Sequence, residues 1–301
     1  MTFGQRAFLL LQHLLPKVLL TRFGGFVAGL RIRALRRFVI RRFIAHYGVA
    51  MHEAANPDPD AYGSFNEFFT RRLREDARPM PATAAEIASP CDGTVSEAGP
   101  LDGTRVLQAK GVTYAAADLL GDAALAERFR DGAFATIYLS PRDYHRVHMP
   151  ADGVLERMIY VPGGLYSVNP ATVAARRGLF ARNERIVSVF RHPSGASFAM
   201  VLVGAMVVGG IRTTWAGRVT PRSAEPWNMV ADAPVKLARG DEMGLFELGS
   251  TVILIFEGGS VGWRPELAPG APIRLGRTIG RWLEPRAAAG GDDDERDAAG
   301  S

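Results

Sequence analysis

The 301-residue chain has an ordinary globular composition, with 22% charged residues, 47% hydrophobic residues and a formal net charge of +5. This length supports a full hydrophobic core in one large domain with appendages. The charge is unevenly spread, because residues 1–50 hold nine Lys/Arg and no acid, whereas the tail from Asp292 holds five acids and one arginine. The body between them is neutral, which argues against a nucleic-acid-binding protein.

The cysteine and hydropathy patterns exclude several classes of protein. A single cysteine, Cys91, allows neither an intramolecular disulfide framework nor a cysteine-rich zinc site. No apolar run reaches 18 residues, so no conventional membrane span is expected. The apolar stretch 7–15 is followed by Pro16-Lys17 without a small-residue cleavage site, so we expect no cleaved signal peptide.

Residues 1–55 are predicted to form basic amphipathic helices that associate with a membrane. In the segment 29–47, apolar residues recur at spacings of three and four among arginines: Ile32, Leu35, Val39 and Phe43. A basic helix without acids is typical of a bilayer interface, with its cations on anionic headgroups. The alternatives are a helix docked on its own domain with a solvated basic face, and a mitochondrial-type presequence.

The body of the chain is predicted to be rich in β-strands. Asn56–Asp60 has the composition of a linker, and Ser64 with Glu67 forms a capping box for a short helix over 64–73. Beyond residue 88, short apolar runs alternate with turn residues: 93–96, 105–107, 134–139, 153–160, 185–190, 197–203, 207–213 and 251–256. One helix is expected over 115–130. This pattern predicts an α+β fold with a barrel-like or sandwich-like domain over 60–285, followed by a disordered acidic tail over 286–301.

Three places carry candidate chemistry. Gly249-Ser250 directly precedes a buried strand; the pair could be a simple turn, or Gly249 could let the Ser250 hydroxyl reach the carbonyl before it. His145 and His148 stand in what we expect to be a proline-bounded loop and suit proton transfer. A metal pair is the alternative, but no third ligand accompanies them. Asp92 lies in an Asp-Gly turn, where a structural use is the default.

Six motifs together resemble a known family. They are Phe65-Asn-Glu-Phe-Phe69, Pro90-Cys-Asp-Gly93, Tyr144-His-Arg-Val-His-Met-Pro150, Phe180-Ala-Arg-Asn-Glu-Arg185, Gly204-Ala-Met-Val-Val-Gly209 and Leu248-Gly-Ser-Thr251. In this order, over residues 60–285, they resemble phosphatidylserine decarboxylases of the bacterial, membrane-associated type. No position that matters departs from the family's pattern, and the acidic tail is an addition.

The resemblance implies a proenzyme that cuts itself between Gly249 and Ser250. The products would be a β chain of residues 1–249 and an α chain of residues 250–301, which stay together as a heterodimer. The Ser250 hydroxyl would attack the Gly249 carbonyl, and elimination with loss of ammonia would turn Ser250 into a pyruvoyl group. By the same resemblance, His148 is the base and Asp92 its orienting carboxylate, which completes a self-cleavage triad with Ser250.

The resemblance also implies the reaction and its partners. The pyruvoyl group would form a Schiff base with phosphatidylserine and act as electron sink, releasing CO2 and phosphatidylethanolamine, with neither metal nor pyridoxal phosphate. His145 or His148 would be the proton donor. We expect a homo-oligomer without nucleic acid, bound peripherally to anionic lipids at the cytoplasmic side of the cell membrane.

Other functions are compatible with the same residues. Ser250, His148 and Asp92 could serve a serine hydrolase, although no Gly-x-Ser-x-Gly elbow is present. A decarboxylase could act on another serine-headed lipid. An unprocessed, non-enzymatic membrane-binding β-domain is the alternative from a different class.

Overall fold

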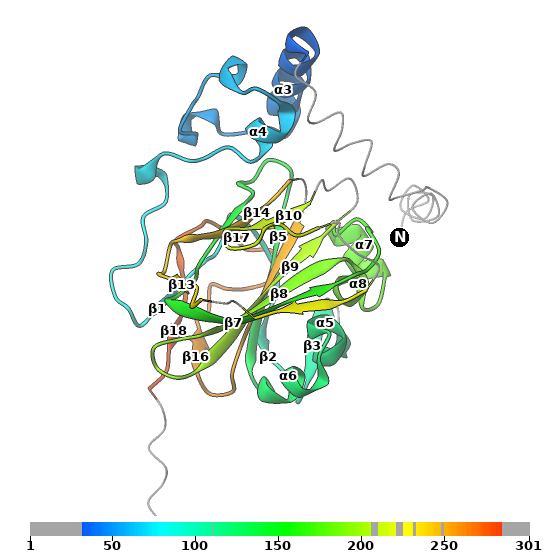
Figure 1. Cartoon of the computed structure of the whole chain (residues 1–301), viewed down its shortest axis with the longest axis vertical. Coiled ribbons are helices and arrows are strands. Elements are labelled where there is room, and N and C mark those ends of the chain that lie inside the picture. Colours follow the sequence, from blue (N-terminus) through cyan, green and yellow to red (C-terminus); the bar gives the residue numbers. More distant parts are fainter. Residues whose placement is uncertain are drawn as a thin grey trace, which may run out of the picture.

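The computed structural model describes residues 32–109, 111–205, 210–220, 225–230, 233–247 and 250–284. An N-terminal segment with two α-helices lies at one end of the molecule, and a body of antiparallel sheets lies beneath it (Figure 1). The predicted first helix, the acidic tail and Gly249 lie outside the described residues. No helix among the described residues is long and apolar enough to cross a bilayer.

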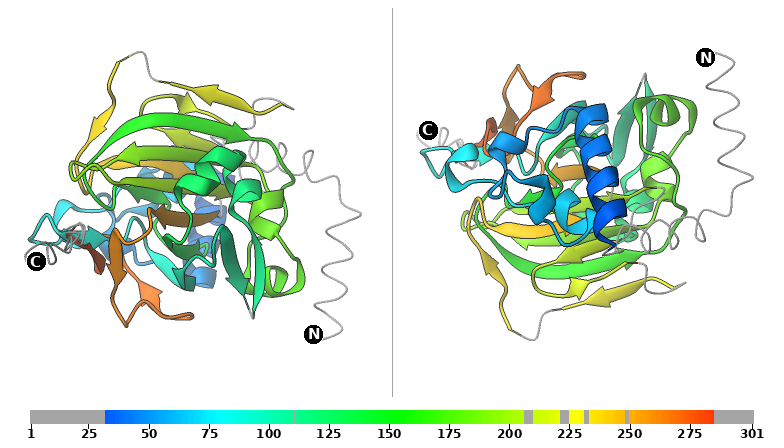
Figure 2. Two further views of the ribbon diagram at one scale, coloured as in Figure 1. Left: turned by 90° about the horizontal axis from the view of Figure 1, so that it is seen from below. Right: turned by 90° about the horizontal axis from the view of Figure 1, so that it is seen from above.

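The N-terminal segment packs around a small core of its own. Helix α3 (Arg33–Tyr47) ends where Gly48 takes a left-handed φ of 67°, and it lies across the end of the molecule (Figure 2). Its Ile40 packs with Val49, Tyr62 and Phe68. The segment continues through η1 (Met51–Glu53), η2 (Pro59–Ala61), α4 (Phe65–Phe69) and η3 (Glu75–Ala77). One face of α3 is therefore docked on its own protein.

A nine-stranded antiparallel sheet forms the centre of the body. Its strands follow the order β12 (Trp227–Met229), β7 (Gly153–Val161), β8 (Arg185–Arg191), β9 (Ser197–Gly204), β15 (Ser250–Phe256), β5 (Ala133–Leu139), β2 (Gly93–Pro100) and β17 (Pro272–Ile273), while β13 (Lys236–Leu237) pairs with β7. Strand β15 is a central strand, because all seven of its residues pair with both β5 and β9.

Three smaller sheets complete the body. The first has the order β11 (Gly217–Arg218), β10 (Ile211–Thr213), β14 (Glu242–Phe246) and β6 (Arg146–His148). The second has the order β1 (Glu86–Ala88), β18 (Thr278–Trp282) and β16 (Val261–Trp263), and the third is the hairpin of β3 (Arg105–Ala109) and β4 (Val112–Ala115).

The central sheet is buried on both faces. Val252 and Leu254 of β15 belong to a core shared with the first two small sheets, whereas Ile253 and Ile255 belong to a second core. That second core is covered by the β3–β4 hairpin and by α5 (Ala116–Leu120), α6 (Ala123–Arg128), α7 (Pro170–Ala175) and α8 (Leu179–Arg182). Since alternate residues of a strand face opposite sides, two-sided burial explains the unbroken apolar run 252–256.

The expected α+β class is confirmed, and the sheets stack as in a sandwich. Among the described residues each sheet runs from one edge strand to another, so none closes into a barrel. The single helix expected over 115–130 is wrong. Gly121 ends α5 with a left-handed φ of 69°, and the Asp122 side chain accepts a hydrogen bond from the Leu125 amide at 2.8 Å to begin α6.

The predicted capping box is formed only in part in the helix expected over 64–73, because Glu67 binds the amide before the N-cap residue Ser64 and not that of Ser64 itself. The Ser64 hydroxyl accepts from the Glu67 amide at 3.1 Å, and the Glu67 carboxylate accepts from the Gly63 amide at 2.7 Å. The helix itself is shorter than expected, since α4 ends at Phe69.

Replacing Leu254 with alanine should strongly destabilise the fold, because this fully buried side chain lies at the middle of the central strand. We expect a loss of about 2–5 kcal/mol in the free energy of unfolding, measured by urea denaturation. Leu283→Ala is the matched control, since Leu283 is 39% exposed, and it should change stability far less. Equal losses in the two variants would contradict this account of the core.

Candidate functional site

The two histidines lie on and beside a short strand rather than in the loop that the sequence predicted. Strand β6 pairs with β14, and the Phe246 amide donates to the His145 carbonyl at 3.0 Å. On the other side, the His148 amide donates to the Pro90 carbonyl at 2.8 Å. The histidine-bearing segment is therefore held between the turn that contains Asp92 and the strand that leads to Ser250.

Ser250 is the first residue of β15, where the chain crosses from one sheet to another. It lies opposite Leu139 on one side and Gly204 on the other and is completely buried. Its Oγ has no hydrogen-bond partner among the described residues. By strand alternation its side chain shares the face of Val252, toward the core that also contains Phe246 of β14.

His148 is held as a neutral imidazole with a defined tautomer. Its Nδ1 lies 2.8 Å from the Gly240 carbonyl oxygen, which can only accept, so Nδ1 carries the proton. The Nε2 atom therefore accepts from the Tyr144 hydroxyl at 3.2 Å. Burial lowers the pKa of His148, which keeps the Nε2 lone pair available as a base near neutral pH.

His145 is more deeply enclosed and is also neutral. Its Nδ1–H donates to the Asp143 carbonyl at 2.8 Å, and its ring lies 4.1 Å from the Phe69 ring. Burial lowers the pKa of His145 to about 3. Its Nε2 has no partner among the described residues.

Asp92 is bound to an arginine that the sequence analysis did not single out. Its carboxylate accepts from Arg78 Nε at 2.9 Å, from Arg78 Nη2 at 2.6 Å and from the Leu275 amide at 2.8 Å. Arg78 Nη2 also donates to Glu53 at 2.6 Å. Burial opposes the charge on Arg78, but its bonds to Asp92 and Glu53 outweigh burial and raise its pKa.

The three residues of the predicted triad are not joined by side-chain hydrogen bonds in this structure. Among the described residues, Asp92 and Ser250 make no hydrogen bond to His148. Strand β5 lies between the two residues in the sheet. Its Tyr138 is opposite Thr94 of β2, and the next residue of β5, Leu139, is opposite Ser250 of β15. The Asp92 turn is thus two strands away from Ser250, about 10 Å in the sheet plane.

A polar cavity of about 290 Å³ lies between the N-terminal segment and the Asp92 turn. Arg71 and Tyr144 line it together with Asp92, and no spacing in the sequence had marked Arg71 or Arg78. Both arginines follow the Phe-rich α4, but their partners lie far away in the chain, so only the tertiary structure identifies them.

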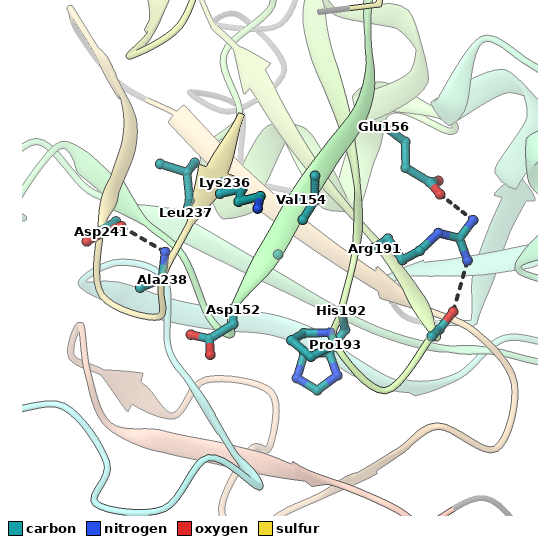
Figure 3. A pocket seen from close by; sticks show the side chains of 12 residues that line it. Asp152, Val154, Glu156, Arg191, His192, Pro193, Lys236, Leu237, Ala238 and Asp241 are labelled. Atoms are coloured by element: carbon teal, nitrogen blue, oxygen red, sulfur yellow. Dashed lines mark hydrogen bonds and ion pairs between the residues drawn. The ribbon is translucent and has the colours of Figure 1, made fainter. Parts of the chain in front are cut away.

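A larger cavity, of about 830 Å³, contains none of the predicted site residues. It lies between β7, β13 and the turn after β8 (Figure 3). Several polar groups on its wall are already bonded: Arg191 pairs with Glu156, and the Asp241 carboxylate accepts from the Ala238 amide at 2.8 Å. We therefore place the candidate active site at β6 and the start of β15. No group of three or more potential metal ligands occurs among the described residues.

This arrangement defines a class of enzyme: an α+β protein with a buried serine at the start of a central strand and two neutral histidines on the segment beside it. The comparisons with known proteins agree. A family model described as phosphatidylserine decarboxylase matches residues 65–281, and a second, described as PSD, matches residues 7–48. The chain belongs to the phosphatidylserine decarboxylase family.

Curated relatives share this family over nearly their whole length. A phosphatidylserine decarboxylase proenzyme of Acidovorax ebreus is 52% identical over 280 residues, which cover 92% of this chain and 98% of the relative. Proteins of the same name from Chromobacterium violaceum and Bordetella petrii are 50% and 48% identical, covering 92% and 93% of this chain and 99% and 98% of the relatives.

The pKa of His145 predicts how stability should change with pH. The unfolded chain takes up a proton near pH 6.5 and the folded protein only near pH 3, so the free energy of unfolding falls as pH drops between these values. From pH 7 to pH 4 this residue should remove about 3 kcal/mol. Urea denaturation of the Ser250→Ala protein measures this loss. Adding His145→Gln should flatten the pH dependence by a similar amount, and parallel curves would contradict the burial of a neutral His145.

Proposed function

We propose that this chain is a self-processing, pyruvoyl-dependent decarboxylase that converts phosphatidylserine to phosphatidylethanolamine and CO2. The observation that carries the proposal is the position of Ser250. It is buried, its Oγ is unpartnered among the described residues, and it stands where the chain leaves β14 and begins the central strand. Membership of the family supports the substrate, since the curated relatives are called phosphatidylserine decarboxylase proenzymes.

Self-cleavage would use Ser250 as nucleophile on the Gly249 carbonyl, with His148 as base. The neutral tautomer of His148 can accept a proton at Nε2. In this structure Nε2 accepts a hydrogen bond from the Tyr144 hydroxyl at 3.2 Å. Tyr144 must therefore either pass the Ser250 proton on to His148 Nε2 or move its hydroxyl away so that Ser250 can reach Nε2. We assign Asp92 to stabilising the charge that forms on His148. In this structure its carboxylate is bonded to Arg78, so it would have to leave Arg78 to reach the imidazole.

Decarboxylation would use the pyruvoyl group formed from Ser250 as electron sink. The substrate's ammonium must lose a proton before it reacts, and its carbon must gain one after CO2 leaves. We assign this transfer to His145, because its Nε2 is unpartnered among the described residues. His148 remains bonded to Tyr144 and is the second candidate.

The membrane would be reached through residues 1–55, which precede the catalytic domain at 60–285 and the acidic tail at 286–301. Three apolar side chains at the start of α3 support this, since the N-cap residue Ile32 is 59% exposed and Leu35 and Phe38 of the helix are 43% and 66% exposed. The spacing of three between Leu35 and Phe38 places these two on one side of the helix. We further propose peripheral binding to anionic lipids at the cytoplasmic face of the cell membrane and assembly of the 1–249 and 250–301 chains into a heterodimer that oligomerises.

Ser250→Ala should stay a single chain and lack decarboxylase activity, because the nucleophile and the pyruvoyl precursor are both removed. Denaturing electrophoresis and intact-mass analysis should show two chains for the natural protein, one of them blocked by a pyruvoyl group at position 250. Thr251→Val is the matched control, since Thr251 is equally buried on the same strand and also lacks a partner among the described residues; it should still be cut.

Other outcomes of that experiment identify the alternatives. A Ser250→Ala protein that is cut would refute the nucleophile. A natural chain that stays whole and hydrolyses esters would indicate a serine hydrolase, and a whole chain that only binds vesicles would indicate a non-enzymatic domain. Activity on a different serine-headed lipid in a correctly cut protein would revise the substrate alone.

Removing the exposed apolar face of α3 should weaken membrane binding. We expect the triple variant Ile32→Ser, Leu35→Ser, Phe38→Ser to lose at least about tenfold in co-sedimentation with anionic vesicles, because each buried apolar side chain contributes transfer free energy. Val230→Ser is the control, since Val230 is 72% exposed on the body of the protein. Equal vesicle binding by the two variants would reject α3 as a membrane contact.

A further inference from the structure

One buried cation near the candidate site, Arg71, forms no ion pair among the described residues. Arg71 is only 4% exposed and lines the 290 Å³ cavity between the N-terminal segment and the Asp92 turn. Its Nη2 donates to the Arg142 carbonyl at 3.2 Å, but its Nε and Nη1 have no partner among the described residues. Leaving a buried guanidinium half-satisfied is costly, so its retention points to a ligand.

The position of Arg71 is set by packing. Its guanidinium lies 5.6 Å from the centre of the Phe68 ring, which belongs to the small N-terminal core. Burial lowers the pKa of Arg71, although the guanidinium stays charged at neutral pH. The guanidinium group is thus held beside the cavity by a rigid support, and its unpartnered Nε and Nη1 are themselves buried.

The carboxylates around the cavity are already bonded to other groups. Glu53 pairs with Arg78 and Arg274, and Asp92 pairs with Arg78. Asp143 accepts from the amide and the hydroxyl of Ser140, both at 2.7 Å. Arg71 forms no ion pair among the described residues. Asp92 and Asp143 favour the charge on Arg71 without forming an ion pair with it. The cavity therefore offers an anionic ligand a desolvated cation that has no ion-pair partner among the described residues.

The cavity is connected both to the candidate catalytic residues and to the proposed membrane contact. Tyr144 lines the cavity, and its hydroxyl bonds to His148. Gly48, directly after α3, also lines it, about 15 Å along the helix axis from the exposed Phe38. A lipid whose acyl chains remain in the bilayer beside α3 could bring its headgroup to this position.

We propose that this cavity binds the phosphodiester of the lipid substrate and that Arg71 pairs with its negative charge. The inference rests on the proposed function. The guanidinium fork suits phosphate oxygens. A phosphodiester keeps its charge throughout the reaction, so pairing with it does not oppose the chemistry. Pairing with the serine carboxylate would instead stabilise the group that must leave as CO2, and would raise the barrier.

The first test is kinetic and uses soluble short-chain phosphatidylserine with Arg71→Gln, Arg71→Lys and Arg72→Gln. We expect KM to rise roughly tenfold or more in Arg71→Gln, with kcat changed far less and partial rescue in Arg71→Lys. The control Arg72→Gln should behave as the natural protein, since the adjacent Arg72 is exposed and does not line the cavity. Equal KM values in variants that cut themselves normally would overturn the proposal.

The second test separates the two anionic groups of the substrate. Glycerophosphocholine has the phosphodiester but no reactive amine and no carboxylate, and free serine has the carboxylate but no phosphate. Glycerophosphocholine should be a competitive inhibitor of the natural protein and of Arg72→Gln. For Arg71→Gln its inhibition constant should be roughly tenfold higher or more. Failure to compete in the natural protein, or serine inhibition that depends on Arg71 instead, would overturn the proposal.

A third measurement does not require activity. Calorimetry should detect glycerophosphocholine binding to the uncut Ser250→Ala protein and its loss on adding Arg71→Lys or Arg71→Gln. Absence of binding to the uncut protein would overturn the cavity assignment while leaving decarboxylation untouched. Conversely, a natural chain that stays whole and inactive would count against the proposed function before any Arg71 variant is made.

Discussion

The pairing of β15 with a neighbour on each side determines where the candidate chemistry can occur. All seven residues from Ser250 to Phe256 are matched with β5 on one side and with β9 on the other. Such a strand cannot slip by one residue without exchanging its two buried faces. Ser250 is therefore fixed at the beginning of a strand that is paired on both sides. The preceding strand, β14, belongs to a different sheet. A reaction at this serine would have a well-defined geometry without a flexible loop.

A second set of contacts joins parts of the chain that are far apart in sequence. Arg78 binds both Glu53 of the N-terminal segment and Asp92 of the candidate site, and Glu53 also pairs with Arg274. Arg78 and the two acids are largely buried, so breaking one pair leaves an uncompensated charge. A shift of the N-terminal segment would therefore also move Asp92, because Arg78 is bonded to both. Contact of that segment with a membrane would then affect the candidate site.

The sequence predicted the elements with strong local patterns. The apolar runs 134–139, 185–190 and 251–256 became β5, β8 and β15, because two-sided burial requires continuous apolar strands. The expected helix over 115–130 failed because the left-handed turn at Gly121 outweighed the helical composition around it. The histidine motif pointed to the site, but the tautomers of His145 and His148 are set by the carbonyls of Asp143 and Gly240. Such tertiary partners, like those of Arg71, leave no local pattern, and the catalytic roles themselves stay predictions.

The placement of β15 also has a consequence for how the two proposed chains arise. From residue 250 on, β15 pairs with β5 and β9, β17 with β2, and β18 with β1. Among the described residues, β16–β18 is the only strand pair internal to that portion. Synthesised alone, this portion would expose two unpaired edges of an apolar strand and would be prone to aggregate. Synthesis as one polypeptide supplies each C-terminal portion with the N-terminal strands that it pairs with, in a one-to-one ratio. Scission after assembly would then create a new terminus inside a finished protein, with no need for two subunits to find each other in the cell.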